Sequence, residues 1–417
     1  MSGEAKELDF GSRLRSLDWR TIDFLKIAEP LAVASPLALI ISAQELVMAV
    51  ISLLFLAHSW RERDWAWARR SWFVAALGLW AYAFLRTLLI HPTATGVLTA
   101  LQWIHFALYA AALAEWILPR PQIRDRLLWA TVATMTFYAL DCLLQYEVGR
   151  DIIGRPTPDG RLTSVFHKPG VGAEIGWLYL PAMVGLWGKG YPLAGAALGL
   201  ISIVAVLLSG DRMGLLIALT ALILFCILAA RIRRTLLVAA PAAALLIGAI
   251  LYFNPAIYQR QVETTATIIE RIDQSVYGVL VLTALEVTRD HPVFGVGVHQ
   301  YQKACLNEKY GPPLVGRFQY KRCQGHPHNV YAQWLAEGGV IGLVLYASFA
   351  IAAFGSVFQI ARAHRGDLVL SALAVCVALR FWPIETSTSF YSSWAAEPLF
   401  LVLGWALSYR KAEVEDG

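Results

Sequence analysis

The sequence predicts an all-α polytopic membrane protein with about twelve transmembrane helices and one large polar loop on the non-cytoplasmic side. Of its 417 residues, 57% are hydrophobic and only 16% are charged, whereas a soluble domain carries about 25% charged residues. The charges are missing from apolar blocks of about 17 to 23 residues, the length that crosses a hydrocarbon core about 30 Å thick. The fifteen Trp residues fit this class because their amphipathic rings collect at membrane interfaces.

The apolar blocks divide the chain into five parts. We expect a cytoplasmic N-terminal segment over 1–24, nine spans over 25–253, a large loop over 254–336, three spans over 337–409 and a cytoplasmic tail over 410–417. The expected spans are 25–42, 43–59, 71–90, 97–117, 127–145, 170–187, 190–209, 212–230, 235–253, 337–360, 367–383 and 393–409. The first 25 residues mix both charge signs before any apolar core, so no cleavable signal peptide is predicted.

The first pair of spans decides the orientation of the chain. Residues 25–59 form one continuous apolar stretch with Pro30 and Pro36, which could be two short spans or one kinked helix. Two spans place every short Arg-rich loop on the same side as the N-terminus, namely 61–70, 120–126, 231–234 and 362–365. The positive-inside rule then predicts that both termini are cytoplasmic and that the 254–336 loop faces the other side.

The charge pattern argues against nucleic acid as a partner. The net charge is +5, and no basic run is interleaved with aromatic residues. Asp residues are not paired in a pattern that indicates a divalent-metal site, so no metal or other cofactor is predicted.

The polar segment with the strongest chemical signal is 325–342, where the large loop becomes a membrane helix. It contains His326, His328 and Asn329. A histidine, with an ordinary pKa of about 6.5, is the natural proton acceptor near neutral pH. The alternative is an interfacial His beside an Asn that caps the returning helix.

Three more polar segments bring cations to the same side. Arg212, in Ser209–Gly214, is costly at the outer end of a span unless it is used or paired with Asp211. Arg289 precedes a Pro-Gly-rich stretch, 291–301, whose two glycines do not form a dinucleotide fingerprint. Arg161 and Lys168 share the outer loop 146–169. Ionisable residues also fall inside or beside spans, with partners that the sequence does not reveal: Arg86, Glu115, Asp141, Glu174, Arg380 and Glu397.

Two cysteines lie in the large loop just before the histidines. Cys305 and Cys323 are a disulfide candidate if this loop faces an oxidising compartment. Two free thiols are the alternative, and a metal site is disfavoured because the spacing matches no common zinc pattern.

Several cations and one base on one membrane face suit a substrate that carries a diphosphate and an acceptor hydroxyl. The planar guanidinium of Arg makes bidentate contacts to phosphate. A neutral imidazole can remove the proton of a hydroxyl group. The arginines would then stabilise the leaving group in place of a metal ion.

The motifs together resemble those of bacterial O-antigen ligases and the related O-antigen polymerases. His328-Asn329, followed after nine residues by Gly339-Val-Ile-Gly342, is similar to their signature, and 291–301 is similar to their "hPlfGvG" element. Ser209–Arg212 resembles their "S-x-x-R" element, and 161–169 a weaker fourth element.

The resemblance implies a membrane-embedded glycosyltransferase of the bacterial inner membrane, active on the periplasmic face and without a metal. A ligase moves a glycan, with inversion, from undecaprenyl diphosphate to a sugar hydroxyl of lipid A-core, whereas a polymerase extends a lipid-linked glycan. The family's essential His corresponds to His328 and its first essential Arg to Arg212. The position of its second Arg is occupied by Tyr277–Val279, so Arg289 is taken instead, with Arg271 and Arg260 behind it. His326, Asn329, Arg161 and Lys168 are expected to support the site, and a polytopic transporter is the remoter alternative.

Overall fold

The computed structural model describes residues 22–38, 43–90, 92–157, 160–310, 314–315, 320–386 and 388–413. Of the predicted cytoplasmic segment 1–24 only 22–24 is described, and of the predicted tail 410–417 only 410–413. Within the described part, the regular secondary structure is helical except for two strands of two residues each, β1 (Leu314–Val315) and β2 (Tyr320–Lys321). These strands are antiparallel, with Leu314 opposite Lys321.

Helices overlap each of the predicted apolar blocks, and residues 39–42 of the predicted span 25–42 lie outside the described residues. These helices are α2 (Phe24–Ala38), α3 (Gln44–Glu62), α4 (Ser71–Ile90), α5 (Ala94–Gln102), α6 (Ile104–Ala112) with η2 (Leu113–Ile117), α7 (Pro121–Val148), α8 (Val171–Gly188), α9 (Pro192–Leu208), α10 (Arg212–Leu228), α11 (Ala230–Phe253), α16 (Val330–Ala363), α17 (Leu368–Arg380) and α18 (Ser393–Leu407). Four helical stretches are long and apolar enough to cross a membrane, or five if the bent pair 240–253 and 255–270 is one span. The chain is thus a polytopic membrane protein, and twelve spans remain a prediction.

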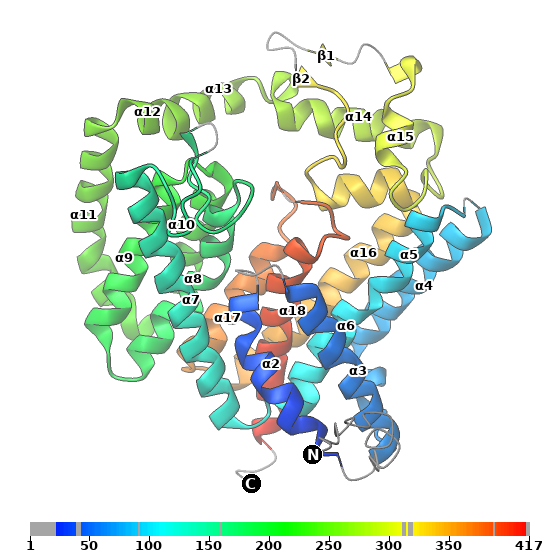
Figure 1. The fold of residues 1–417 in the computed structure, drawn as a ribbon, viewed down its shortest axis with the longest axis horizontal. Coiled ribbons are helices and arrows are strands. Elements are labelled where there is room, and N and C mark those ends of the chain that lie inside the picture. The colour runs from blue at the N-terminus through cyan, green and yellow to red at the C-terminus, as the bar shows by residue number, and fades with distance from the viewer. Residues whose placement is uncertain are drawn as a thin grey trace, which may run out of the picture.

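The large loop is mostly helical and covers one end of the bundle. It contains α12 (Pro255–Tyr258), η4 (Gln259–Glu263), α13 (Thr264–Glu270), η5 (Ile272–Gln274), α14 (Val276–Asp290), α15 (Tyr301–Cys305) and η6 (Glu308–Tyr310). After α11 the chain turns by 107°, and α12, α13 and α14 then run across the end opposite to that where α2 begins and α18 ends (Figure 1). The helices of the large loop therefore lie at the end of the bundle opposite to the start of α2 and the end of α18.

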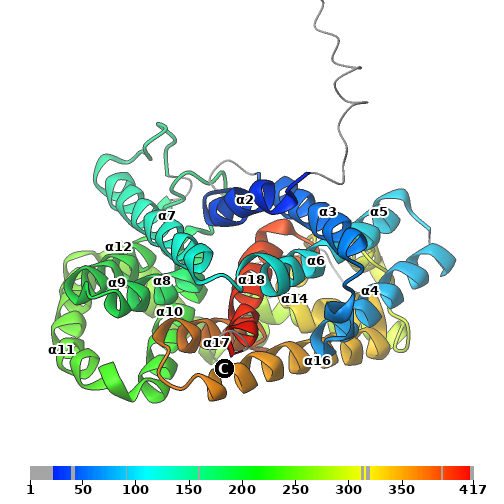
Figure 2. The same cartoon turned by 90° about the horizontal axis from the view of Figure 1, so that it is seen from below.

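The buried core surrounds α8 and α18. Nearly all of α8 is buried, where it packs against α7, α9, α10 and α17, while α18 packs against α6 and α17, as the view from below also shows (Figure 2). Glycines allow the closest of these contacts, as is common between membrane helices. A Cβ atom on Gly214 of α10 would lie 2.5 Å from the carbonyl carbon of Gly172, so the starts of α8 and α10 meet with their backbones nearly in contact.

Helix α16 is broken at its outer end, and the Pro-Gly-rich segment 292–297 fills the break. Gly339 has φ 64° and ψ −165°, values that in practice require glycine. Val296 N–H donates to the Ala336 carbonyl (2.9 Å), Gly297 N–H donates to the Glu337 carbonyl (2.8 Å), and Val340 N–H donates to the Pro292 carbonyl (2.9 Å). The main chain of 292–297 thus replaces hydrogen bonds that the break removes from the helix.

The contact between 292–297 and the break in α16 forms a joint, and helix α4 also binds to it. Arg86 donates from Nε to the carbonyl of Phe294 (2.9 Å) and from Nη2 to that of Gly295, and the Tyr82 hydroxyl donates to the carbonyl of Gly338 (2.5 Å). Arg86 is only 7% exposed. Its partner is therefore main-chain oxygen, which no pattern of charged residues in the sequence could indicate.

Candidate functional site

His328 stands at the entry to α16. Its φ of 53° is uncommon for a residue other than glycine. Its Nε2 lies 2.9 Å from Oε1 of Gln324, and its ring centroid is 4.2 Å from that of His326. With Oε1 of Gln324 as the acceptor, the imidazole of His328 donates from Nε2.

Asn329 has the capping role that was the alternative interpretation of this motif. Its Oδ1 accepts from Ala332 N–H (2.9 Å) at the start of α16. Its Nδ2 donates to the carbonyls of Pro383 (2.7 Å) and Glu385 (3.3 Å). Asn329 thus fixes both the helix that follows His328 and the segment 381–392 that joins α17 to α18.

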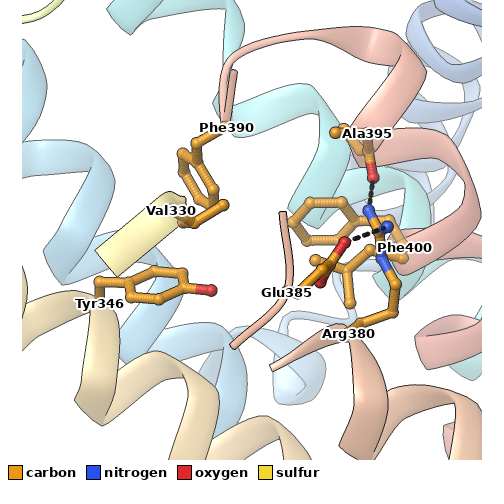
Figure 3. A pocket seen from close by; sticks show the side chains of 9 residues that line it. Val330, Tyr346, Arg380, Glu385, Phe390, Ala395 and Phe400 are labelled. Atoms are coloured by element: carbon orange, nitrogen blue, oxygen red, sulfur yellow. Dashed lines mark hydrogen bonds and ion pairs between the residues drawn. The ribbon is translucent and has the colours of Figure 1, made fainter. Parts of the chain in front are cut away.

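The 381–392 segment is held to the same helix at further points. The Tyr331 hydroxyl donates to the carbonyl of Phe381 (2.6 Å), and Gln333 Nε2 donates to Ser389 Oγ (3.0 Å). Arg380 bonds Glu385 (3.3 Å) and the Ala395 carbonyl, as Figure 3 shows. Burial raises the pKa of Glu385 to about 7, with the charge of Arg380 opposing this shift. The small cavity of Figure 3, about 20 Å³, is a packing gap behind the segment.

Three arginines from three segments gather at the turn between α9 and α10. Arg260 of η4 donates from Nε to the carbonyl of Gly210 (2.9 Å). Burial lowers the pKa of Arg260, and the like charges of Arg161 and then Arg212 lower it further. Gly210 is required here because a Cβ atom at its φ of 70° would lie 2.5 Å from Arg260 Nε. Arg161 and Arg212 therefore lie close enough to Arg260 for their charges to act on it.

Asp211 is occupied by the backbone. Its Oδ1 accepts from Gly214 N–H (3.1 Å) at the start of α10, and its Oδ2 accepts from Ala173 N–H (3.1 Å) near the start of α8. Among the described residues, no ion pair within 4.0 Å joins it to Arg212. The alternative in which Arg212 is neutralised by its neighbour is thus not what this structure contains.

The structure does not bring the other two sequence-predicted arginines into this cluster. Tyr277, near the start of α14, is close enough to Arg260 to affect its pKa. Arg289 is exposed twelve residues further along α14, which is about 18 Å at 1.5 Å per residue. Arg271 is exposed at the end of α13 and lines a shallow groove with Gln259 and Gln274. Of these three arginines, Arg260 is the one that feels the charge of Arg212, although the sequence placed it behind Arg289.

A cavity of about 600 Å³ opens next to the histidine pair. Lys168 and His326, both predicted to support the site, line it together with His167 and Arg155. Residues 161–169 thus connect the arginine cluster to this cavity, because Arg161 lies near the cluster and Lys168 lines the cavity. Arg155 was not singled out from sequence, since an Arg in a polar outer loop has no distinguishing pattern.

The loop that carries these cations is fixed from α7. Gln145 Oε1 accepts from the N–H groups of Thr163 (2.8 Å) and Ser164 (2.9 Å), and Asp141 Oδ2 accepts from the Ser164 hydroxyl (2.5 Å). The buried Asp141 is thus explained as an anchor of this loop.

At the opposite end of the bundle Glu115 pairs with Arg70 (2.9 Å) and Arg410 (3.7 Å).

Cys305 and Cys323 are joined by a disulfide, with Cα atoms 5.7 Å apart. The bond joins α15 to the chain just before His326 and His328. It therefore restricts the positions that this part of the loop can adopt. Among the described residues, no group of three His, Cys, Asp or Glu side chains is arranged to hold a metal ion.

Apolar helices of membrane-crossing length, with polar side chains collected at one end, define a polytopic membrane protein. Residues 197–347, less than half of the chain, match the family model described as O-antigen ligase, and this match supports a relation to the O-antigen ligase superfamily. The match includes Arg212, Arg260 and His328, while Arg161 and Lys168 precede it. No curated protein matches the chain.

Proposed function

We propose that this protein is an O-antigen ligase. It transfers a polysaccharide from undecaprenyl diphosphate to a sugar hydroxyl of lipid A-core, in the bacterial inner membrane with its site facing the periplasm and both termini cytoplasmic. The observation that carries the proposal is the gathering of Arg161, Arg212 and Arg260 at the end of the bundle where His328 enters α16. The superfamily match supports a glycosyl transfer of this kind.

The chemistry follows from these groups. His328 accepts the proton of the acceptor hydroxyl, and the oxygen attacks the anomeric carbon from the face opposite the diphosphate. The glycosidic bond forms as the bond to the diphosphate oxygen breaks, so the configuration inverts. The leaving undecaprenyl diphosphate takes the electron pair, and Arg212 and Arg260 stabilise its charge. The 254–336 loop, in this proposal, is the unit that brings Arg260 and His328 to the membrane surface.

The test is transfer by purified enzyme from a lipid-linked glycan, with and without lipid A-core. We expect product only when lipid A-core is present. His328→Ala should abolish transfer with an unchanged melting curve, and His291→Ala, at an exposed loop histidine, should leave it intact. Wild-type activity in His328→Ala would reject the role of His328. Loss of activity with EDTA that Mg²⁺ or Mn²⁺ restores would reject the arginine-only account of the leaving group.

The second candidate is a polymerase of the same superfamily, because the same site could pass the glycan to another lipid-linked acceptor. Extension of the lipid-linked glycan in the absence of lipid A-core would favour it. Restoration of surface O-antigen in a ligase-null strain, but not in a polymerase-null strain, would favour the ligase. A transporter is disfavoured, since its charges should line a path across the bilayer, whereas these cations lie at one end.

A further inference from the structure

The cavity beside the histidine pair is lined by basic side chains. Its lining includes Arg155, Lys168, His167 and His326, and no Asp or Glu among the described residues. Neither Arg155 nor Lys168 takes part in an ion pair in the described part of the chain. A concave site lined by one sign of charge attracts a ligand of the opposite sign.

Arg155 is held in place at the wall of this cavity. Arg155 donates from Nη1 to the carbonyl of Val165 (2.6 Å), and its Nη2 lies 3.4 Å from Nε2 of His167. The loop that contains Val165 and His167 is itself held by Gln145 and Asp141, as described above. A cationic site that is already in place binds an anion with little loss of conformational entropy.

The donor diphosphate has a separate set of cations in the proposed site. Arg161, Arg212 and Arg260 gather at the α9–α10 turn, and Arg212 and Arg260 are absent from the lining of the cavity. The cavity therefore has room for a second anionic group that belongs to a different part of the substrates.

The remaining lining groups are those that bind a sugar. Thr388, Ser389 and Ser392 contribute hydroxyl groups, and Trp394 contributes an indole ring. The ring is fixed by an edge-on contact with Phe166, with centroids 4.5 Å apart. Hydroxyl groups match the donors and acceptors of a sugar, and a fixed aromatic ring offers an apolar face for one side of the sugar ring.

We propose that this cavity binds an acidic sugar of the acceptor glycan, one that carries a phosphate group. The inference rests on the proposed ligase function and extends it to the acceptor's chemistry. His326 lines the cavity and its ring contacts that of His328. An acceptor whose acidic group is held by Arg155 and Lys168 is thereby bound one side chain away from the base.

The experiment measures transfer by Arg155→Gln and Lys168→Gln with two acceptors, native phosphorylated lipid A-core and the same acceptor after phosphatase treatment. With the phosphorylated acceptor, each variant should raise the acceptor KM about tenfold, the loss expected for one charge-assisted contact. With the treated acceptor, wild type and variants should be alike, and the donor KM should not change. Lys303→Gln, at an exposed lysine of α15, is the control and should match wild type.

A rise in the donor KM in either variant would overturn the proposal, because the cavity would then serve the donor diphosphate. An equal loss with both acceptors would also overturn it. If the wild type transfers nothing to lipid A-core, the ligase function fails, and the cavity is then tested by calorimetry. Core oligosaccharide released from lipid A should bind wild type more tightly before phosphatase treatment than after it, and Lys168→Gln should remove this difference. Equal binding in both forms would refute the cavity's preference for an acidic sugar.

Discussion

Replacing Arg86 by methionine tests whether the break in α16 depends on a charged side chain from α4. Methionine keeps the length of the apolar stem and removes the guanidinium, so the carbonyls of Phe294 and Gly295 lose their donors. Because both carbonyls belong to the segment that fills the break, the outer half of α16 should loosen together with His328 at its start.

The magnitude follows from the contacts. A hydrogen bond from a charged donor contributes about 1.5–3 kcal/mol, so two such bonds represent about 3–6 kcal/mol. The third nitrogen of Arg86, Nη1, is buried and has no hydrogen-bond partner among the described residues. Its removal offsets part of this loss by about 1–3 kcal/mol. We therefore expect Arg86→Met to lower the free energy of unfolding by about 3 kcal/mol. Arg86→Lys, with one compact ammonium, should lose roughly half as much.

The assay is unfolding of the detergent-solubilised protein by titration with sodium dodecyl sulfate, followed by circular dichroism, with transfer activity measured in parallel. Arg69→Met is the matched control, since Arg69 is exposed in η1 (Ala66–Arg69), and it should unfold like the wild type. If Arg86→Met unfolds at the wild-type midpoint and retains full activity, the joint does not depend on Arg86 and the reasoning is wrong.

Three further predictions concern the site. Arg260→Gln should lower kcat by about 100-fold, the effect of removing one group that stabilises the charge of the leaving group. Arg289→Gln should keep kcat within about twofold of the wild type. If transfer kinetics show the larger loss in Arg289→Gln, the second diphosphate-binding arginine is Arg289. Asn329→Ala should lower the free energy of unfolding by about 1–2 kcal/mol through loss of the cap, and an unchanged melting curve would contradict the capping role. Burial raises the pKa of Glu385 from 4.5 to about 7, so the folded state favours its protonated form. The wild type should therefore lose stability as the pH rises from about 4.5 to about 7. Glu385→Gln should make the free energy of unfolding less dependent on pH. An equal slope of this free energy against pH in both proteins would contradict the role of Glu385.

The sequence was sufficient to locate the helices and the polar segments between them. Apolar blocks alone predicted α4, α7 and α16, and the polar residues of Ser209–Gly214 and 161–169 indicated two segments that do meet. This works because a helix in a membrane needs a long run without charge, which is visible in one dimension.

Two features of the site could not be predicted in this way. The choice between Arg260 and Arg289 depends on the 107° turn after α11 and on the direction of α14, and neither follows from hydropathy. The partner of Arg86 is a pair of main-chain carbonyls, and these are present at every residue. Both depend on where the backbone passes in three dimensions.

The joint between 292–297 and the break in α16 has a consequence for mutational tolerance. It consists of hydrogen bonds between main-chain groups, so most side chains of 292–297 take no part in it. Val293 and Phe294 are 49% and 50% exposed, and substitutions there should be accepted widely. Gly295 and Gly339 should accept none, since a Cβ atom on either would lie within 2.4 Å of the opposite backbone. A saturation library over this segment should therefore show sharp intolerance at the glycines beside freely variable neighbours.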